Sequence, residues 1–292
     1  MGTWSRQRAR LVLTDCMESE HGTVTSVSCV DTYAFTKPVR EQIHLIAGIG
    51  VKGDVHAGLY VKHRGRVRND PTQPNFRQVH LIQRELFDQV GEKGYDVEAG
   101  DLGENVTTSG IDLLALPRGT ILRFGPPGSR GANEVTDAGA VADGNSAEAA
   151  PKAAAAAGGE GAEAAGETAA ATSRATRTGA GGPLAAVLEV AAAAEPDRGN
   201  PGAAVAIAAA VARDRPDDPR PAVVVAGLRN PCGQINGFRD GLLKEVLGKD
   251  ERGGVVRKAG VMGVVLRSGV VRPGDVVTVE LPPLPHAPLE AI

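Results

Sequence analysis

The chain has 292 residues with a formal net charge of -3, which gives no general attraction to nucleic acid or to an acidic membrane surface, so we expect neither as a partner. No apolar run approaches the roughly 20 residues that a membrane-spanning helix needs. A hydrophobic fraction of 42% beside only 3% aromatic residues, 38 glycines and 19 prolines predicts one globular unit diluted by a segment that does not pack.

The first ten residues contain three arginines and no acidic residue, but the apolar run that follows them is short. Because a secretory signal needs a longer apolar core, we expect a cytoplasmic protein, with a mitochondrial presequence as the alternative. The cysteines, Cys16, Cys29 and Cys232, are odd in number and widely spaced. They therefore indicate neither a disulfide framework nor a zinc site, and a reducing compartment fits them best.

Short β-like runs follow one another along the first half of the chain. Strands are predicted over 22–31, 43–46, 77–82 and 120–124. A short helix is predicted over 83–90, because apolar residues recur there at helical spacing and glycines follow. Between the second and third of these strands lies a glycine-rich loop, 48–58, whose backbone can approach a neighbouring group closely.

The composition changes abruptly near residue 125. Between residues 131 and 220 there are 33 alanines and no aromatic residue. Such a segment buries too little apolar surface to offset chain entropy, so we predict a disordered low-complexity insert with at most a transient helix over 184–194. We therefore predict three parts. Residues 1–21 form an N-terminal extension, residues 22–125 and 222–292 together form one folded domain, and residues 126–221 form the insert.

After the insert the folded pattern resumes. A strand is predicted over 222–228, a helix over 238–247, and further strands over 261–266 and 270–280. Many short strands with only two convincing helices predict a mainly β fold of the barrel type, with a few short helices.

The strand at 222–228 leads directly into Arg229-Asn230-Pro231-Cys232-Gly233. A cysteine presented in a Pro/Gly turn, with an arginine three residues earlier, lies in an electropositive setting that favours a reactive thiolate. Taken alone, this pattern also fits a small buried side chain at the end of a strand.

Four segments in a fixed order resemble one family. They are Gly53-Asp54-x-His56, Gly103-Glu104-Asn105-Val106, Leu228-Arg229-Asn230-Pro231-Cys232 and Val270-x-Arg272-Pro273-Gly274-Asp275. Together they resemble a MOSC domain, which is the C-terminal domain of molybdenum cofactor sulfurase and also occurs as a stand-alone protein. The resemblance covers nearly all of the chain outside the alanine-rich segment. It implies a MOSC-type β-barrel related to the barrel domain of pyruvate kinase, interrupted here by the insert.

The resemblance also implies two functions for Cys232. The cysteine would ligate the metal of the molybdenum cofactor (molybdopterin) in an oxidoreductase that reduces N-hydroxylated or related N-oxygenated small molecules with electrons from a separate electron-donor protein. Alternatively, it would carry sulfur as a persulfide received from a pyridoxal-phosphate-dependent cysteine desulfurase. The chain has no desulfurase half, and no intrinsic pyridoxal phosphate site is visible in it.

On this resemblance, the expected catalytic residues are Cys232 and His56, with Cys232 also the metal ligand. The expected cofactor-binding residues are Gly53, Asp54, Arg77, Asn105, Arg229 and Asn230. The basic run at 62–68 offers further cations for a phosphate group. Plainer alternatives stay open: Asp54 can simply fix its loop, His80 is expected to be structural, and Cys232 can be structural in a binding module.

Overall fold

The computed structural model describes residues 21–68, 70–127, 182–194, 200–250 and 253–292. Nearly all of the predicted N-terminal extension, including Cys16, and residues 128–181 of the predicted insert lie outside the described residues.

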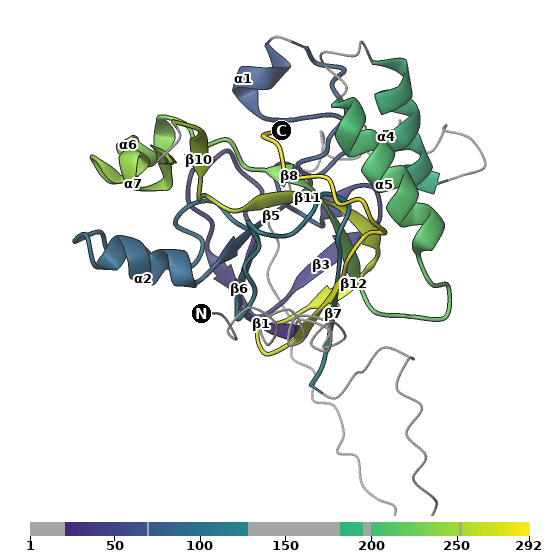
Figure 1. The fold of residues 1–292 in the computed structure, drawn as a ribbon, viewed down its shortest axis with the longest axis horizontal. Coiled ribbons are helices and arrows are strands. Elements are labelled where there is room, and N and C mark those ends of the chain that lie inside the picture. The colour runs from purple at the N-terminus through teal and green to yellow at the C-terminus, as the bar shows by residue number, and fades with distance from the viewer. Residues whose placement is uncertain (1–20, 69, 128–181, 195–199, 251–252) are drawn as a thin grey trace, which may run out of the picture.

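Among the described residues, seven strands close into a mixed β-barrel (Figure 1). They are β1 (His21–Ser28), β5 (Val79–Gln83), β6 (Val106–Ser109), β7 (Ile121–Gly125), β8 (Ala222–Leu228), β11 (Val261–Arg267) and β13 (Val276–Glu280). Their order around the barrel is β13-β7-β8-β11-β5-β6-β1, and β1 pairs with β13 to close it. Only β5 and β6 pair in parallel. The predicted mainly β, barrel-type fold is confirmed.

Shorter strands decorate the barrel. They are β2 (Val39–Arg40), β3 (Ile43–Ile46), β4 (Gly50–Val51), β9 (Leu247–Lys249), β10 (Val255–Arg257) and β12 (Gly269–Val271). Strands β12, β3 and β4 form a separate three-stranded sheet, β9 pairs with β10, and β2 pairs antiparallel with β1. The predicted strand over 270–280 is thus two strands, divided at the turn that contains Pro273 and Gly274.

The barrel is filled by β-branched side chains that alternate along each strand. In β8, Val223 and Val225 belong to the core cluster inside the barrel, whereas Val224 belongs to a second cluster on its outer face. This follows from the two-residue period of a strand, and it explains why β8 reads as a continuous apolar run: both of its faces are covered.

The described helices are short except for two. They are α1 (Arg64–Val67), α2 (Glu85–Gly91), α4 (Gly182–Ala193), α5 (Pro201–Arg213), α6 (Gln234–Phe238) and α7 (Leu242–Val246). The single helix predicted over 238–247 is wrong. Gly241 has φ +81°, which interrupts a right-handed helix, and Leu247 already pairs with Arg257 as part of a strand.

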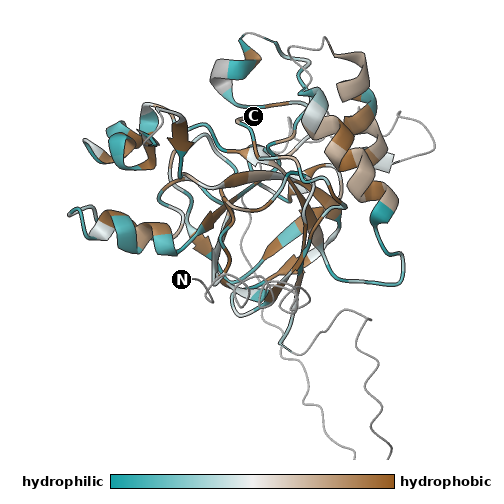
Figure 2. Cartoon of the chain, in the orientation of Figure 1, coloured by the Kyte–Doolittle hydropathy of each residue, from teal (hydrophilic) through white to brown (hydrophobic). Residues whose placement is uncertain are grey.

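The sequence predicts a disordered insert over 126–221 with at most a transient helix over 184–194; residues 128–181 lie outside the described residues, but two helices lie between residues 182 and 213. Helices α4 and α5 lie side by side against the outside of the barrel, and their surfaces are largely apolar (Figure 2). Val187 and Ile207 are fully buried there, between small residues such as Ala203 and Ala210. Alanine side chains add little hydrophobicity each, but they let a helix approach a sheet closely enough to bury the few larger side chains between them.

Helix α4 also explains a glycine in the loop at 48–58. A Cβ atom on Gly48, whose φ is +70°, would lie 2.3 Å from the backbone nitrogen of Leu184. The glycine-rich loop was predicted to approach a neighbouring group closely. At Gly48 that neighbour is the first turn of α4.

An ion-pair network fixes the segment after α5 to the barrel. Arg123 of β7 is fully buried, and its guanidinium donates to Asp214 at 2.9 Å and to Glu280 of β13 at 2.7 Å. Such a charge is tolerated in the interior because carboxylates surround it. None of the helices in the described residues combines the length and the apolar run needed to cross a membrane.

We expect Ile207→Ala to lower the free energy of unfolding by about 2–5 kcal/mol, because it opens a cavity between α5 and β8. Val205→Ala, at a side chain that is 69% exposed on the same helix, is the matched control and should change stability little. Urea unfolding measures both. Equal stabilities for the two variants would contradict the docking of α5 on the barrel.

Candidate functional site

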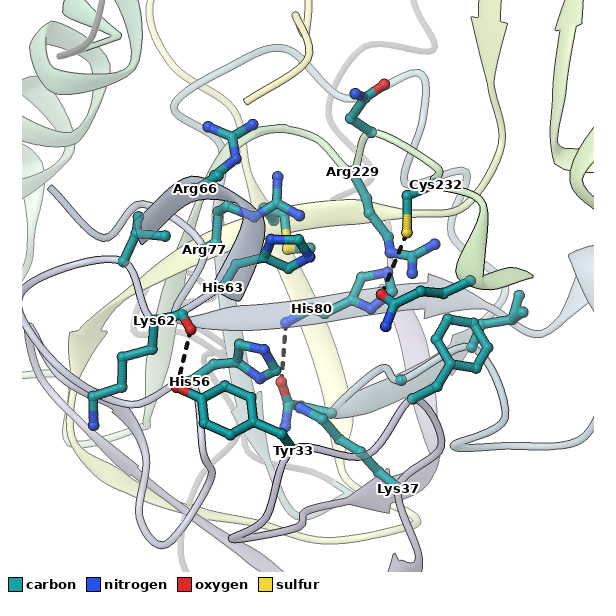
Figure 3. Close-up of a pocket in the computed structure, with 18 of the residues that line it drawn as sticks. Tyr33, Lys37, His56, Lys62, His63, Arg66, Arg77, His80, Arg229 and Cys232 are labelled. Carbon is teal, nitrogen blue, oxygen red and sulfur yellow. Dashed lines mark hydrogen bonds between the residues drawn. The ribbon is translucent and has the colours of Figure 1, made fainter. Parts of the chain in front are cut away.

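A cavity of about 340 Å³ opens beside the end of β8. Six of the eight site residues predicted from the sequence line it: His56, Arg77, Asn105, Arg229, Asn230 and Cys232 (Figure 3). The other two, Gly53 and Asp54, do not line the cavity. Its volume lies within the range of ordinary small-molecule sites.

The end of β8 positions Cys232. The backbone of Leu228 donates to Glu290 at 2.7 Å, and that of Arg229 donates to Gly260 at 3.0 Å, so the chain is held on both sides as it leaves the barrel. The following turn carries Cys232, whose thiol is half-buried and lies 3.4 Å from the amide oxygen of Gln234 in α6. The thiol is therefore accessible from the cavity while its backbone is fixed.

Asp54 lies behind the lining and binds three of its members. Its Oδ2 accepts hydrogen bonds from Lys37 Nζ at 2.7 Å and from Asn105 Nδ2 at 2.8 Å. Its Oδ1 accepts from the backbone nitrogen of His56 at 2.9 Å and lies 3.3 Å from that residue's Nδ1. The Asp54 carboxylate therefore joins three segments that are far apart in the sequence.

Burial alone would raise the pKa of Asp54. Hydrogen bonds from His56, together with the charge and hydrogen bond of Lys37, more than offset that effect and hold the pKa well below its usual range. The Asp54–Lys37 pair is thus ionised in the folded protein, and both side chains are nearly or fully buried.

Lys37 is a site residue that the sequence reading missed. It lines the cavity, and its ammonium group pairs with Asp54. In the sequence it is a single lysine before a proline, and nothing local distinguishes it from a solvated surface residue. Only its partner 17 positions later marks it.

Asn105 and His80 are committed to internal contacts. The Asn105 amide donates to Asp54 and to the Ser28 carbonyl, and its oxygen accepts from the His80 backbone at 3.2 Å. His80 itself lies 2.7 Å from the Ala259 carbonyl, and burial lowers its pKa, as does the charge of Arg229. Asn105 was expected to recognise a ligand through its amide, but in the structure that amide orders the cavity wall.

Asn75, which the sequence analysis also did not identify, links two backbone segments beneath the same wall. It is 2% exposed, and its amide nitrogen donates to the carbonyls of His56 and Gly58 at 2.9 Å each. Its oxygen accepts from the backbone of Arg77 at 3.1 Å. The loop that carries His56 is in this way joined to the strand that follows Arg77.

Arg229, Arg77 and Arg66 give the cavity its charge. Arg229 is 8% exposed, and its Nη1 has no hydrogen-bond partner among the described residues. Arg77 donates to the backbone oxygen of Ile292. Burial lowers the pKa of all three, and for Arg77 the nearby charges of Arg66 and Arg229 lower it further.

No acidic side chain of the described residues lines the cavity. Interaction with Cys232 raises the pKa of both Arg77 and Arg229, against the lowering caused by burial. A negatively charged ligand beside Cys232 is therefore what this wall can accommodate best.

The remaining predicted residues take lesser positions. Gly53 has φ +78° and open space around it, so it serves the turn rather than a close contact. Asn230 accepts a hydrogen bond from Arg257 at 3.1 Å. Cys29 lies outside the cavity lining, and burial raises the pKa of its thiol. The described residues hold no group of three or more His, Cys, Asp or Glu side chains arranged to bind a bare metal ion.

Comparison with known proteins bears on the fold. Neither a scan against protein families nor a search of curated proteins gave a match. The structure resembles the crystal structure of the YuaD protein from Bacillus subtilis with a TM-score of 0.51 at 16% sequence identity, covering 91% of this chain and 99% of that one. The YiiM protein from Geobacillus stearothermophilus matches with a TM-score of 0.41 at 13% identity, covering 91% and 77%. At such identities the likeness to YuaD establishes the barrel fold and nothing finer.

We expect Asp54→Asn to lower the free energy of unfolding at pH 7 by about 3–5 kcal/mol, because it leaves Lys37 buried without a counter-charge. Since the pKa of Asp54 is depressed on folding, its contribution is complete above the unfolded-state pKa of about 3.9 and is lost as the pH falls below that value.

Urea unfolding between pH 3 and pH 7 measures this contribution. The gap between wild type and Asp54→Asn should narrow below pH 4, whereas Asp31→Asn, at an exposed carboxylate, should track the wild type throughout. A gap that stays constant down to pH 3 would contradict the ionised buried pair.

Proposed function

We propose that this chain is a MOSC-type protein that binds molybdenum cofactor through Cys232 and reduces N-hydroxylated or related N-oxygenated compounds. The observation that carries the proposal is the position of Cys232: an accessible thiol opens into a basic cavity beside a buried guanidinium, Arg229, that has an unpaired Nη1.

The chemistry of the cavity fits such a cofactor. A pterin cofactor brings a phosphate group and a metal that already has ligands of its own, so the protein need supply one thiolate and a set of cations. Cys232 would supply the thiolate, and Arg229 and Arg77 would meet the phosphate, because both guanidinium groups are buried beside that cysteine without an Asp or Glu partner. Asn230, whose oxygen is already bonded to Arg257, keeps its amide nitrogen for the pterin edge.

When bound, the cofactor would supply a two-electron redox centre, and the protein would supply orientation and electrostatics. Reduction of an N–OH group breaks the N–O bond, consumes two electrons and two protons, and releases water. With only three cysteines in the chain, the electrons would come from a separate donor protein rather than from an iron–sulfur cluster of its own.

His56 is the best placed group to supply a proton. Its ring lines the cavity, and its Nδ1 faces the Asp54 carboxylate at 3.3 Å, which leaves Nε2 for a ligand when Nδ1 carries the proton. A carboxylate behind a histidine fixes the orientation of the ring and the nitrogen that carries the proton. Asp54 would thus act through His56 rather than on the substrate.

We expect protein purified from a cofactor-producing host to contain molybdenum and pterin, and Cys232→Ser to lose most of the metal while it still folds cooperatively. Cys29→Ser is the matched control, because this cysteine lies outside the cavity, and it should retain the wild-type content. Metal analysis, pterin fluorescence and thermal unfolding provide the readouts. A folded wild-type protein without metal or pterin would refute the proposal.

The partial exposure of Cys232 also favours a second function, that of a sulfur carrier. The Cys232 thiolate would attack the outer sulfur of a desulfurase persulfide, forming a new S–S bond and releasing the desulfurase thiolate. Mass spectrometry after incubation with a pyridoxal-phosphate-dependent desulfurase and cysteine should then show one added sulfur on Cys232 and none in Cys232→Ser. An unchanged mass in the wild type would exclude this function.

A further inference from the structure

Two basic residues of the cavity, His63 and Arg66, lie on a different side of it from Cys232. His63 directly precedes α1 and Arg66 lies within it, and Figure 3 shows both on the α1 side of the cavity, whereas Arg229 and Cys232 lie on the β8 side. Arg77 lies near His63 and Arg66. The cavity is thus basic on two sides that come from different parts of the chain.

The cations on the α1 side have no paired Asp or Glu side chain in the described part of the protein. Lys37 is paired with Asp54, but no described Asp or Glu side chain forms an ion pair with Arg66, Arg77 or Arg229, and Arg77 donates to the oxygen of Ile292. Burial lowers the pKa of Arg66 and of His63, and the charges of Arg77, His56, Arg66 and Arg229 lower that of His63 further. These groups repel one another, and an anion between them would remove that repulsion.

His63 offers a second sign of a missing partner. Its Nδ1 is buried and has no hydrogen-bond partner among the described residues. An unpaired buried polar atom costs free energy unless something binds it, so a ligand with hydrogen-bonding oxygens would stabilise this side of the cavity. Arg66 likewise has no side-chain hydrogen bond to a described residue, which leaves its guanidinium available.

We propose that His63 and Arg66 bind a carboxylate or phosphate group carried by the substrate itself, while Arg229 serves the ligand of Cys232. This inference rests on the proposed function, since it names the class of substrate for that site: an N-oxygenated compound that is also an anion. The anionic group would anchor the substrate at α1 and direct its other end toward Cys232.

Benzamidoxime and its 4-carboxy and 4-phosphonooxy derivatives provide the test, because they differ only in the anionic group. Isothermal titration of the purified protein at low salt should show at least about tenfold tighter binding of one or both charged compounds than of the uncharged parent. The compound with the larger gain identifies the anionic group as carboxylate or phosphate.

Variants then locate the subsite. Arg66→Ala should abolish the preference for the charged compounds, leave binding of the parent unchanged and retain the wild-type molybdenum content, while Arg66→Lys should keep part of the preference. Arg68→Ala removes the same charge from an exposed residue of the same segment outside the cavity and should behave as wild type.

Equal binding of charged and uncharged compounds by the wild type would overturn the inference, as would no detectable binding of the charged compounds. A preference that survives Arg66→Ala would also overturn it, because Arg66 would then not contribute to anion binding. A loss of molybdenum in that variant would overturn it as well, because Arg66 would then serve the cofactor. Absence of molybdenum from the wild type would refute the proposed function but not the anion subsite. The dependence of anion binding on Arg66 is measured separately, in the same protein.

Discussion

The cavity depends on one buried carboxylate. Asp54 accepts hydrogen bonds from Lys37 and Asn105, which lie in other segments of the chain, and from His56 in its own loop. Moving a charge into the interior costs several kcal/mol and is tolerated only when the partners are nearly complete. No other described group holds these three side chains together. The shape of this wall of the cavity therefore depends on Asp54 being ionised.

This arrangement also separates charge. The negative carboxylate stays behind the wall and neutralises Lys37, whereas the inner surface carries Arg77, Arg229 and Arg66 without acidic neighbours. The half-buried thiol of Cys232 therefore faces a surface that favours a negatively charged ligand. The barrel positions this surface, because Arg229 directly follows β8, Arg77 lies two residues before β5, and both strands pair with β11.

Much of this could be predicted from the sequence, because the informative patterns are local. Alternating valines predicted the strands of the barrel, and the Pro/Gly turn after β8 predicted an accessible Cys232 beside Arg229. Lys37 and Asn75 were missed because their partners are remote in sequence, and a single lysine or asparagine carries no local mark of burial. Helix α5 was missed, and α4 was expected only as a transient helix, because an alanine-rich segment has little apolar surface of its own to bury, although small side chains fit closely against the outer face of β8.

Anomalous diffraction at the molybdenum edge, from crystals of protein purified from a cofactor-producing host, tests the central claim most directly. We expect one strong peak in the cavity at bonding distance from the sulfur of Cys232, with phosphate density beside Arg229. A peak bound elsewhere, or a cavity without a peak in well-ordered crystals, would contradict the assignment of Cys232 as the metal ligand.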